Sequence, residues 1–417
     1  MELKGVERLE LDNGLVLLME KRPNTKKAAL VAGVKVGSVD ETARVNGGSH
    51  FNEHMLFKSN KHRTAREIAE DLEYSGTIIN AYTTWKYTAF TAKAPSRHLN
   101  TAMEVLYEAA TNFEYKADEF ETERQVILTE IRNFINSPER HSLSGIFIPS
   151  LYKGTPLEKK IEGTVDTMAS VKKEELEAFK EKYYAASNMV IAAVGRFDGR
   201  RLVKDVTDIF GSLDKRKIPR RDPKISLKNR RDTVSEERKD ITQTYMCLGY
   251  RVPGYASPDM HALDLISGLL SEGLSSRMYQ ELRDKRGIGY SVGSIFYATG
   301  DEGMFITHIE GFDPARLDEA RQAILDIFDD LKRNPVPDRE FNGTKTLMIS
   351  KFDDMVERIT ERSMALFETE IYGIPYDFRE KEKHINQVTK KQIQETAEKY
   401  LTDDYIMTLL EPAEEKR

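Results

Sequence analysis

Two histidines and a glutamate occur together in the stretch 47–58, which reads GGSHFNEHMLFK. His50 and His54 are four residues apart, so on a helix both imidazole rings lie on one face and can bind a single metal ion. Glu53 lies beside them and can accept a proton from a water molecule on that ion. The order H-x-x-E-H is the reverse of the common H-E-x-x-H order. The stretch predicts a hydrolytic zinc site; two surface histidines beside an incidental glutamate are the alternative.

A catalytic zinc ion needs a third protein ligand. The segment 121–131 offers candidates, because Glu123 and Glu130 are seven residues apart and so lie two turns apart on one face of a predicted helix. Apolar residues between and after them give that helix a side that can be buried. The segment therefore predicts a second helix that carries carboxylates toward the metal.

The sequence HFNEHMLFK is followed by ERQVILTEI, whose Glu130 lies 76 residues after His54 (130 − 54). This combination resembles the pitrilysin or insulinase-type zinc peptidases, in particular the short chains that include the mitochondrial processing peptidase β subunit and its prokaryotic relatives. The resemblance implies that His50, His54 and Glu130 bind one Zn²⁺ ion per chain. It also implies that Glu53 is the general base and that Glu123 orients a ligand imidazole.

Two further sets of residues follow from the same resemblance. In that family the stretch N-A-x-T, here starting at Asn80 and Ala81, lies on an edge strand that receives the substrate as an added strand. The family also carries an arginine and a tyrosine seven residues apart, matched by Arg283 and Tyr290, which are implied to reach the substrate and the developing oxyanion. The alternatives are ordinary sheet core for the first stretch, an exposed helix residue for Arg283 and a core strand residue for Tyr290.

The elements that must position these residues follow from periodicity and turn signals. Asn13-Gly14 between two apolar runs predicts a tight hairpin, because Asn-Gly supplies the positive φ angles that such a turn needs. Strands are expected at 6–11, 15–20, 28–36, 78–83, 85–93 and 189–194, and helices at 64–73, 96–113, 117–136, 171–185 and 200–213.

The second half of the chain repeats the first. Residues 171–183 match 388–400 at an offset of 217 (388 − 171), and residues 119–120 match 340–341 at an offset of 221 (340 − 119). We therefore expect an α+β fold with two homologous α/β domains. As in the resembled processing peptidases, each should have a mixed, largely antiparallel sheet with helices packed on one face.

Only the first copy has the metal ligands. Thr344 and Lys351 stand where Glu123 and Glu130 would be at the offset of 221. A run rich in lysine and arginine between the copies is interpreted as a solvated linker rather than a site for acidic partners. The expected domains are a catalytic zinc-binding domain at 1–214, the basic linker at 215–235, and a domain without a metal site at 236–417 that carries the arginine and tyrosine.

Composition excludes several classes of protein. A net charge of −6 over 417 residues does not indicate a nucleic-acid-binding protein, because such proteins usually carry an excess of positive charge. Cys247 is the only cysteine, so no disulfide can form within the chain and a disulfide-stapled scaffold is excluded. We expect no membrane insertion, because no apolar run is long enough, and a cytoplasmic location, because no signal or transit peptide is seen.

These features together predict a zinc-dependent metalloendopeptidase that cleaves extended, unstructured peptides or presequences. The resemblance implies four α/β units around a closed chamber, so we expect this two-unit chain to form a homodimer, with a heterodimer as the other arrangement. The alternative function is a non-catalytic scaffold of the same fold, like the core subunits of respiratory complexes. Such subunits commonly lose metal ligands, whereas this chain keeps all of them. Presequence processing and general oligopeptide degradation both remain open.

Overall fold

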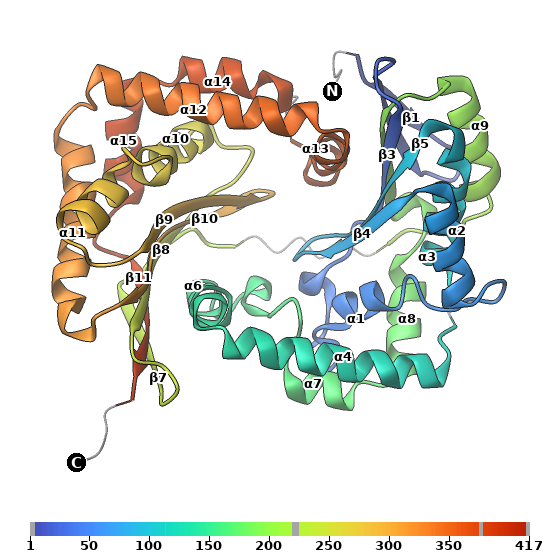
Figure 1. The fold of residues 1–417 in the computed structure, drawn as a ribbon, viewed down its shortest axis with the longest axis horizontal. Coiled ribbons are helices and arrows are strands. Elements are labelled where there is room, and N and C mark those ends of the chain that lie inside the picture. Colours follow the sequence, from blue (N-terminus) through green and yellow to red (C-terminus); the bar gives the residue numbers. More distant parts are fainter. Residues whose placement is uncertain (1–4, 113, 219–224, 375–377, 414–417) are drawn as a thin grey trace. The chain divides into compact units, whose positions relative to one another are not determined.

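The chain forms two units, each with its own sheet and its own core (Figure 1). The computed structural model describes residues 5–112, 114–218, 225–374 and 378–413. Unit 1 comprises Met1–Asn133, Lys159–Pro223 and Met355–Phe378. Unit 2 comprises Phe134–Glu158, Lys224–Asp354 and Arg379–Arg417.

Unit 1 contains a six-stranded sheet in the order β1-β2-β6-β3-β5-β4. Its strands are β1 (Glu7–Glu10), β2 (Val16–Lys21), β3 (Lys27–Val34), β4 (Ile78–Thr83), β5 (Thr88–Pro95) and β6 (Met189–Gly195). Only β2 and β6 pair in parallel; the other neighbours are antiparallel. Strand β4 is an edge strand, so one side of its backbone has no neighbour in this sheet.

Unit 2 contains a five-stranded sheet in the order β7-β11-β8-β10-β9. Its strands are β7 (Asp232–Arg238), β8 (Thr244–Pro253), β9 (Ser291–Thr299), β10 (Glu302–Phe312) and β11 (Ile406–Pro412). Here β7 and β11 are the parallel pair. Apart from β1, the two sheets therefore have the same strand order and directions, which confirms the predicted fold class of two homologous α/β units.

Helices cover both faces of the unit 1 sheet. They are α1 (Gly48–His54), α2 (Ala65–Ser75), α3 (Leu99–Thr111), α4 (Ala117–Asn136), α7 (Val165–Ser170), α8 (Lys173–Tyr183), α9 (Gly199–Phe210) and α13 (Ile359–Tyr372). Side chains of α3, α8 and α9 form the main core with one face of the sheet. Leu366 and Phe367 of α13 pack on the opposite face, against β2, β3 and β6.

Unit 2 is built in the same way. Its helices are α5 (Pro138–Arg140), α6 (Ile148–Leu151), α10 (Met260–Ser271), α11 (Leu317–Arg333), α12 (Asp338–Glu357), α14 (Lys381–Gln387) and α15 (Lys390–Tyr400), with π-helical turns η4 (His141–Phe147) and η7 (Tyr279–Lys285). Helices α10, α11 and α15 form the core with the sheet, while η4 and α6 pack on β8 and β11.

The two halves of the sequence thus exchange one segment each. Residues 134–158 begin in the last turn of α4 but belong to unit 2, and residues 355–378 belong to unit 1, at the repeat offset of 221 (355 − 134). The division by contacts therefore differs from the predicted one at 1–214 and 236–417, because each exchanged helical segment buries its apolar side on the other half's sheet. Of the predicted linker 215–235, residues 219–224 lie outside the described residues and the last four begin β7.

No helix in the described part of the chain combines the length and the apolar character needed to cross a membrane.

Helix α13 is anchored to the unit 1 sheet by a buried ion pair. The Nε atom of Arg362, which is 0% exposed, donates to Oε2 of Glu20 at 2.8 Å. Arg22 donates to the other oxygen of Glu20 at 2.8 and 2.9 Å. Burial raises the pKa of the Glu20 carboxyl, but the two arginines outweigh burial and hold that pKa below its usual value of 4.5.

Removing one partner of this pair should destabilise the protein. We expect Arg362→Met to lower the free energy of unfolding by about 3 kcal/mol, because the Glu20 carboxylate then stays buried with one cation fewer. Since the folded pKa of Glu20 is below the unfolded value, its stabilising effect is present above pH 4.5 and is lost as the pH falls through the folded pKa. The difference in Tm between the wild type and Glu20→Gln should therefore narrow on acidification. A Tm difference that stays constant with pH would contradict this expectation. The control is Glu7→Gln, because Glu7 forms an ion pair with Lys21 at the surface.

Candidate metal centre

The predicted metal-binding stretch forms helix α1, and a buried carboxylate fixes its start. Glu41, which is 0% exposed, accepts hydrogen bonds from the backbone N–H groups of Gly47 at 2.8 Å and Ser49 at 2.7 Å. Its carboxylate also accepts from Nδ2 of Asn46 at 3.0 Å. The first N–H groups of a helix have no partner within it and carry a partial positive charge, so a carboxylate satisfies both needs. Burial raises the pKa of Glu41, and these hydrogen bonds oppose that rise.

Gly47 allows a second segment to pack directly on this helix start. Its φ angle is +91°, and a Cβ atom here would lie 2.7 Å from the carbonyl oxygen of Glu162 and 2.8 Å from Cα of Gly163. Any other residue would clash with that backbone and adopt a strained conformation. Gly47 is therefore required by the packing of residues 162–163 against the start of α1.

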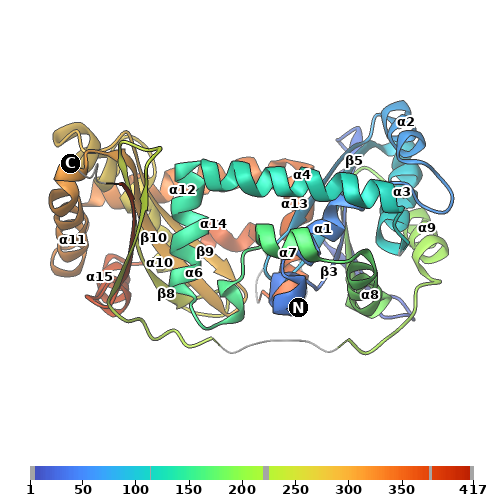
Figure 2. The same ribbon diagram turned by 90° about the horizontal axis from the view of Figure 1, so that it is seen from below.

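Residues Phe51 and Asn52, between the two histidines, hold α1 against the start of α4 and the segment before it. Phe51 stacks on Phe120 with ring centroids 4.5 Å apart, and both rings are buried. Asn52 accepts a hydrogen bond from the Tyr115 hydroxyl at 2.9 Å. Helix α4 then continues as one long helix (Figure 2), so that its later turns carry the two predicted glutamates past α1.

His50, His54 and Glu130 come together with the spacing that a zinc ion needs. Oε2 of Glu130 lies 3.3 Å from Nε2 of His54 and 3.9 Å from Nε2 of His50. One ligand atom of each residue lies within 4.8 Å of the others. Ligands about 2.1 Å from a tetrahedral zinc ion are themselves about 3.4 Å apart. The two nitrogens and the carboxylate therefore fit zinc in both chemistry and size.

Glu123 orients one of the two imidazoles. Its Oε2 lies 3.1 Å from Nδ1 of His54, which leaves Nε2 of that ring for a metal. Lys58 pairs with the other oxygen of Glu123 at 2.5 Å. Nδ1 of His50 is buried and has no hydrogen-bond partner among the described residues, so packing rather than a carboxylate holds that ring.

The protonation of the three groups around the site follows from their surroundings. Burial, together with neighbouring His54, lowers the pKa of His50 to about 4, which favours the neutral, metal-binding imidazole. Burial also acts to lower the pKa of His54, but its hydrogen bonds with Glu130 and Glu123 outweigh burial and raise it. Burial raises the pKa of Glu53, against the effect of a hydrogen bond from Thr83.

Glu53 and two of the three candidate ligands, His50 and Glu130, line one hollow of about 460 Å³ in unit 1. The residues that line it are His50, Glu53, Ala81, Tyr82, Thr83, Thr84, Tyr87, Glu130, Ile161, Glu162 and Met364. The Glu53 carboxylate accepts a hydrogen bond from Oγ1 of Thr83 at 2.5 Å. The predicted general base therefore lies beside the predicted metal site and faces the same space as strand β4.

Asn80 and Ala81 lie on edge strand β4, as predicted. The backbone N–H of Ala81 donates to Oδ1 of Asn80 at 2.9 Å, and Nδ2 of Asn80 donates to the Tyr82 hydroxyl at 2.9 Å. The Asn80 side chain thus covers a backbone donor of the edge strand.

Arg283 and Tyr290 belong to unit 2, whereas the metal-binding residues belong to unit 1. The guanidinium of Arg283 lies 4.1 Å from the ring centroid of Tyr290 and 4.6 Å from that of Tyr279, at cation–π distance. Tyr290 is 79% exposed, so it is not a core residue of the sheet. Arg283 and Tyr290 therefore contact each other, and the phenol side chain of Tyr290 is exposed.

The counterpart of α4 in unit 2 has no carboxylate at either position. Helix α12 corresponds to α4 at the offset of 221 (338 − 117), and Lys351, which forms an ion pair with Glu272, stands at the position of Glu130. In the described part of the chain, the one group of three potential ligands within reach of a metal ion is that of His50, His54 and Glu130.

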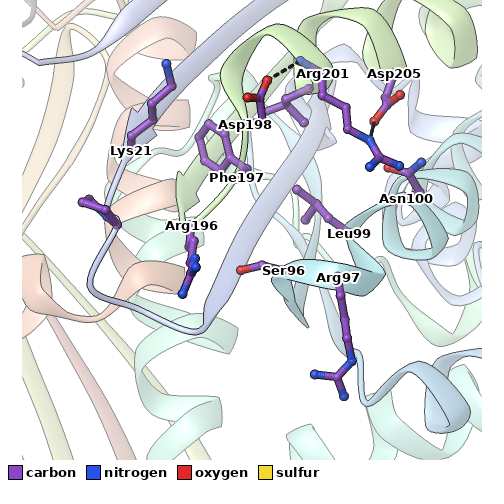
Figure 3. Close-up of a pocket in the computed structure, with 13 residues that line it drawn as sticks. Lys21, Ser96, Arg97, Leu99, Asn100, Arg196, Phe197, Asp198, Arg201 and Asp205 are labelled. Atoms are coloured by element: carbon purple, nitrogen blue, oxygen red, sulfur yellow. Dashed lines mark hydrogen bonds and ion pairs between the residues drawn. The ribbon is translucent and has the colours of Figure 1, made fainter.

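Another hollow of about 620 Å³ lies beside α3 and α9 of unit 1 (Figure 3). It contains none of the metal-binding residues. Asp198 accepts from the backbone N–H of Arg201 at 2.8 Å, and Asp205 pairs with the Arg201 side chain at 3.5 Å. The carboxylates of Asp198 and Asp205 thus interact with residues of helix α9 itself.

Family models match both halves of the chain. Residues 16–165 match "Insulinase (Peptidase family M16)" and residues 170–348 match "Peptidase M16 inactive domain". Together these ranges cover more than half of the sequence, so the chain belongs to the M16 family of peptidases.

Similar proteins agree with this assignment. An "Uncharacterized zinc protease" of Mycobacterium bovis is 30% identical, over 98% of this chain and 94% of its own length. One of Bacillus subtilis is 27% identical, over 98% of both chains. Among solved structures, a protease from Helicobacter pylori aligns with a TM-score of 0.92 and 24% identity, over 98% of this chain and 99% of its own.

Several residues around the site were not predicted from the sequence. Glu41, Lys58, Thr83 and Met364 contact the site or line it, yet none belongs to a ligand motif. Lys58 had a local signal, because it lies four residues after His54 on the same segment. Thr83 and Met364 come from elements distant in sequence, whereas Glu41 lies only nine residues before His50 (50 − 41) but belongs to no motif that marks its contact.

The zinc site can be tested by metal binding. We expect Glu130→Gln to lower zinc affinity by about 100-fold or more, because a neutral amide replaces the charged ligand. Glu123→Gln should cost about 10- to 100-fold, the usual effect of losing a residue that orients a ligand imidazole. A competition titration against a chromophoric chelator measures both.

Glu121→Gln is the matched control, since Glu121 lies on the same helix but pairs with Arg124 at 2.9 Å. Unchanged affinity in Glu130→Gln would place the third ligand elsewhere.

Proposed function

We propose that this chain is a zinc-dependent endopeptidase that cleaves extended, unstructured peptides or presequences. The observation that carries the proposal is that His50, Glu130 and Glu53 line one hollow beside an edge strand, with His54 within metal-binding reach of His50 and Glu130. Zinc bound by His50, His54 and Glu130 would lower the pKa of a water molecule toward neutrality and polarise the scissile carbonyl group.

Glu53 supplies the proton transfer. It accepts the proton that the attacking water loses and delivers it to the amine that leaves, so the carboxylate ends the cycle as it began. Its burial favours this role, because burial raises the pKa of the Glu53 carboxyl and so makes the carboxylate a stronger proton acceptor.

The substrate binds as an added strand along β4. A peptide at this edge would replace Oδ1 of Asn80 with its own carbonyl oxygen as the acceptor for the Ala81 N–H. Recognition through the backbone requires an extended peptide and tolerates many side chains. This is why we propose unstructured peptides and not folded proteins as substrates.

Arg283 and Tyr290 are proposed to contact the substrate and stabilise the negative charge that develops on its carbonyl oxygen. Two observations support this role. The side chain of Tyr290 is exposed, so its hydroxyl can donate a hydrogen bond, and the guanidinium of Arg283 packs on the tyrosine ring.

For the quaternary state we propose a homodimer that encloses the site, with a heterodimer as the alternative. This chain carries both the metal ligands and the arginine–tyrosine pair, so no different partner is needed to complete the set. Sedimentation of the active, zinc-loaded protein as a monomer would contradict it.

A scaffold function is the competing proposal. A chain of complex III₂ from Candida albicans aligns with a TM-score of 0.85 at 16% identity, which is a likeness of fold alone. The presence of all three candidate metal ligands and of Glu53 argues against the scaffold function, because a scaffold needs neither a metal site nor a general base.

Cleavage of an unstructured peptide is the direct test of the activity. We expect internal cuts, read by mass spectrometry, that disappear with a chelator and return with zinc. Glu53→Gln should lower kcat about a thousandfold while binding zinc as the wild type does, because it removes only the proton acceptor. Full activity in Glu53→Gln would refute the general base, and no cleavage by the zinc-loaded wild type would favour the scaffold. Glu121→Gln again serves as the control.

The roles of Arg283 and Tyr290 are tested separately. We expect Tyr290→Phe to lower kcat/KM about 10- to 100-fold, since it removes the hydroxyl and keeps the ring that stacks on Arg283. Arg283→Ala should lower it at least as much. If both variants cleave like the wild type, unit 2 contributes nothing to the chemistry.

A further inference from the structure

Thr83 is placed to control the orientation of Glu53. It is the last residue of β4, and its hydroxyl donates to Oε2 of Glu53 at 2.5 Å. Within the described part of the chain, this is the one hydrogen bond that the Glu53 carboxylate receives. Glu53 also lines the hollow beside the candidate metal ligands, and its Oε1 accepts no hydrogen bond from the described residues.

The position of the Thr83 hydroxyl is set by the sheet. Exposure alternates along β4, and Thr83 lies on the same half-buried face as Ile79 and Ala81, which pack against the core of unit 1. Threonine is branched at Cβ, so its side chain has few rotamers. Glutamate has three rotatable side-chain bonds, and α1 fixes only its backbone. The threonine therefore supplies the restraint that the glutamate lacks.

We propose that Thr83 is a positioning residue for Glu53: its hydrogen bond to Oε2 leaves Oε1 as the oxygen that accepts the proton of the attacking water. This inference rests on the proposed peptidase function. The proton passes from water to Oε1 of Glu53 and then to the leaving amine, while Thr83 keeps its own proton throughout.

The same strand then has two tasks. Its backbone at Ala81 is the proposed contact for the substrate, and two residues later its side chain holds the general base. Loss of the Thr83 hydroxyl should consequently appear in kcat and not in KM.

Kinetics of zinc-loaded variants on an unstructured peptide test this proposal. We expect Thr83→Val, which is nearly isosteric but lacks the hydroxyl, to lower kcat about 10- to 100-fold with KM and zinc affinity unchanged, because small misplacements of a catalytic group have effects of this size. Thr83→Ser should recover most of the loss. Thr88→Val is the matched control, since Thr88 is the cross-strand neighbour of Thr83 and its hydroxyl bonds to Val36 instead.

A double variant separates positioning from a general structural effect. If Thr83 acts through Glu53, adding Thr83→Val to Glu53→Gln should not lower the residual activity further. Thr83→Val with wild-type kcat, a full additional loss in the double variant, or loss of zinc binding would each overturn the proposal. Should Thr83→Val fail to fold, Thr83→Ala is assayed in its place against the same expectations.

Failure of the peptidase function itself is distinguishable. In that case the wild type shows no chelator-sensitive cleavage. A wild type that cleaves and a Glu53→Gln variant that does not would uphold the function, whatever Thr83→Val does.

Discussion

The buried carboxylate of Glu41 is the interaction on which the metal site depends. Helix α1 has seven residues, and a helix that short is not stable without tertiary support. Both histidines and Glu53, the proposed general base, lie on it. Glu41 binds the backbone at its start, and Gly47 lets the segment at 162–163 pack on the same point. The two histidines and Glu53 thus have fixed backbone positions because the start of their helix is fixed.

Much of the fold could be predicted from the sequence because its signals are local. The amphipathic pattern gave α4 its observed bounds, and the Asn13-Gly14 turn gave the β1–β2 hairpin. Strand β5 was predicted at 85–93 but begins at Thr88, because Thr84 and Tyr87 close a turn through Thr84 N–H to Tyr87 O at 2.9 Å. The repeat at offsets of 217 and 221 correctly predicted two sheets of the same topology.

What the sequence did not reveal depends on contacts between distant segments. The exchange of 134–158 and 355–378 could not be read from breaks in the chain, because the unit boundaries fall inside the continuous helices α4 and α12. Thr83 reaches Glu53 across 30 residues. A motif specifies which residues can bind a metal, but only the packing of distant segments specifies what holds those residues in place.

The two halves separate fold from chemistry. Helices α4 and α12 are equally long and occupy the same place in two sheets of equal topology, yet Glu130 of the first is Lys351 in the second. The lysine pairs with Glu272, so an ion pair within the chain stands where a metal ligand would be. The same helix backbone accommodates Glu130 in one unit and Lys351 in the other, because each charged side chain lies near a group of opposite or complementary character: the two histidines for Glu130 and Glu272 for Lys351. The capacity of a unit to hold a metal ion therefore depends on a few side chains and the residues that support them, not on the α/β fold that both units share.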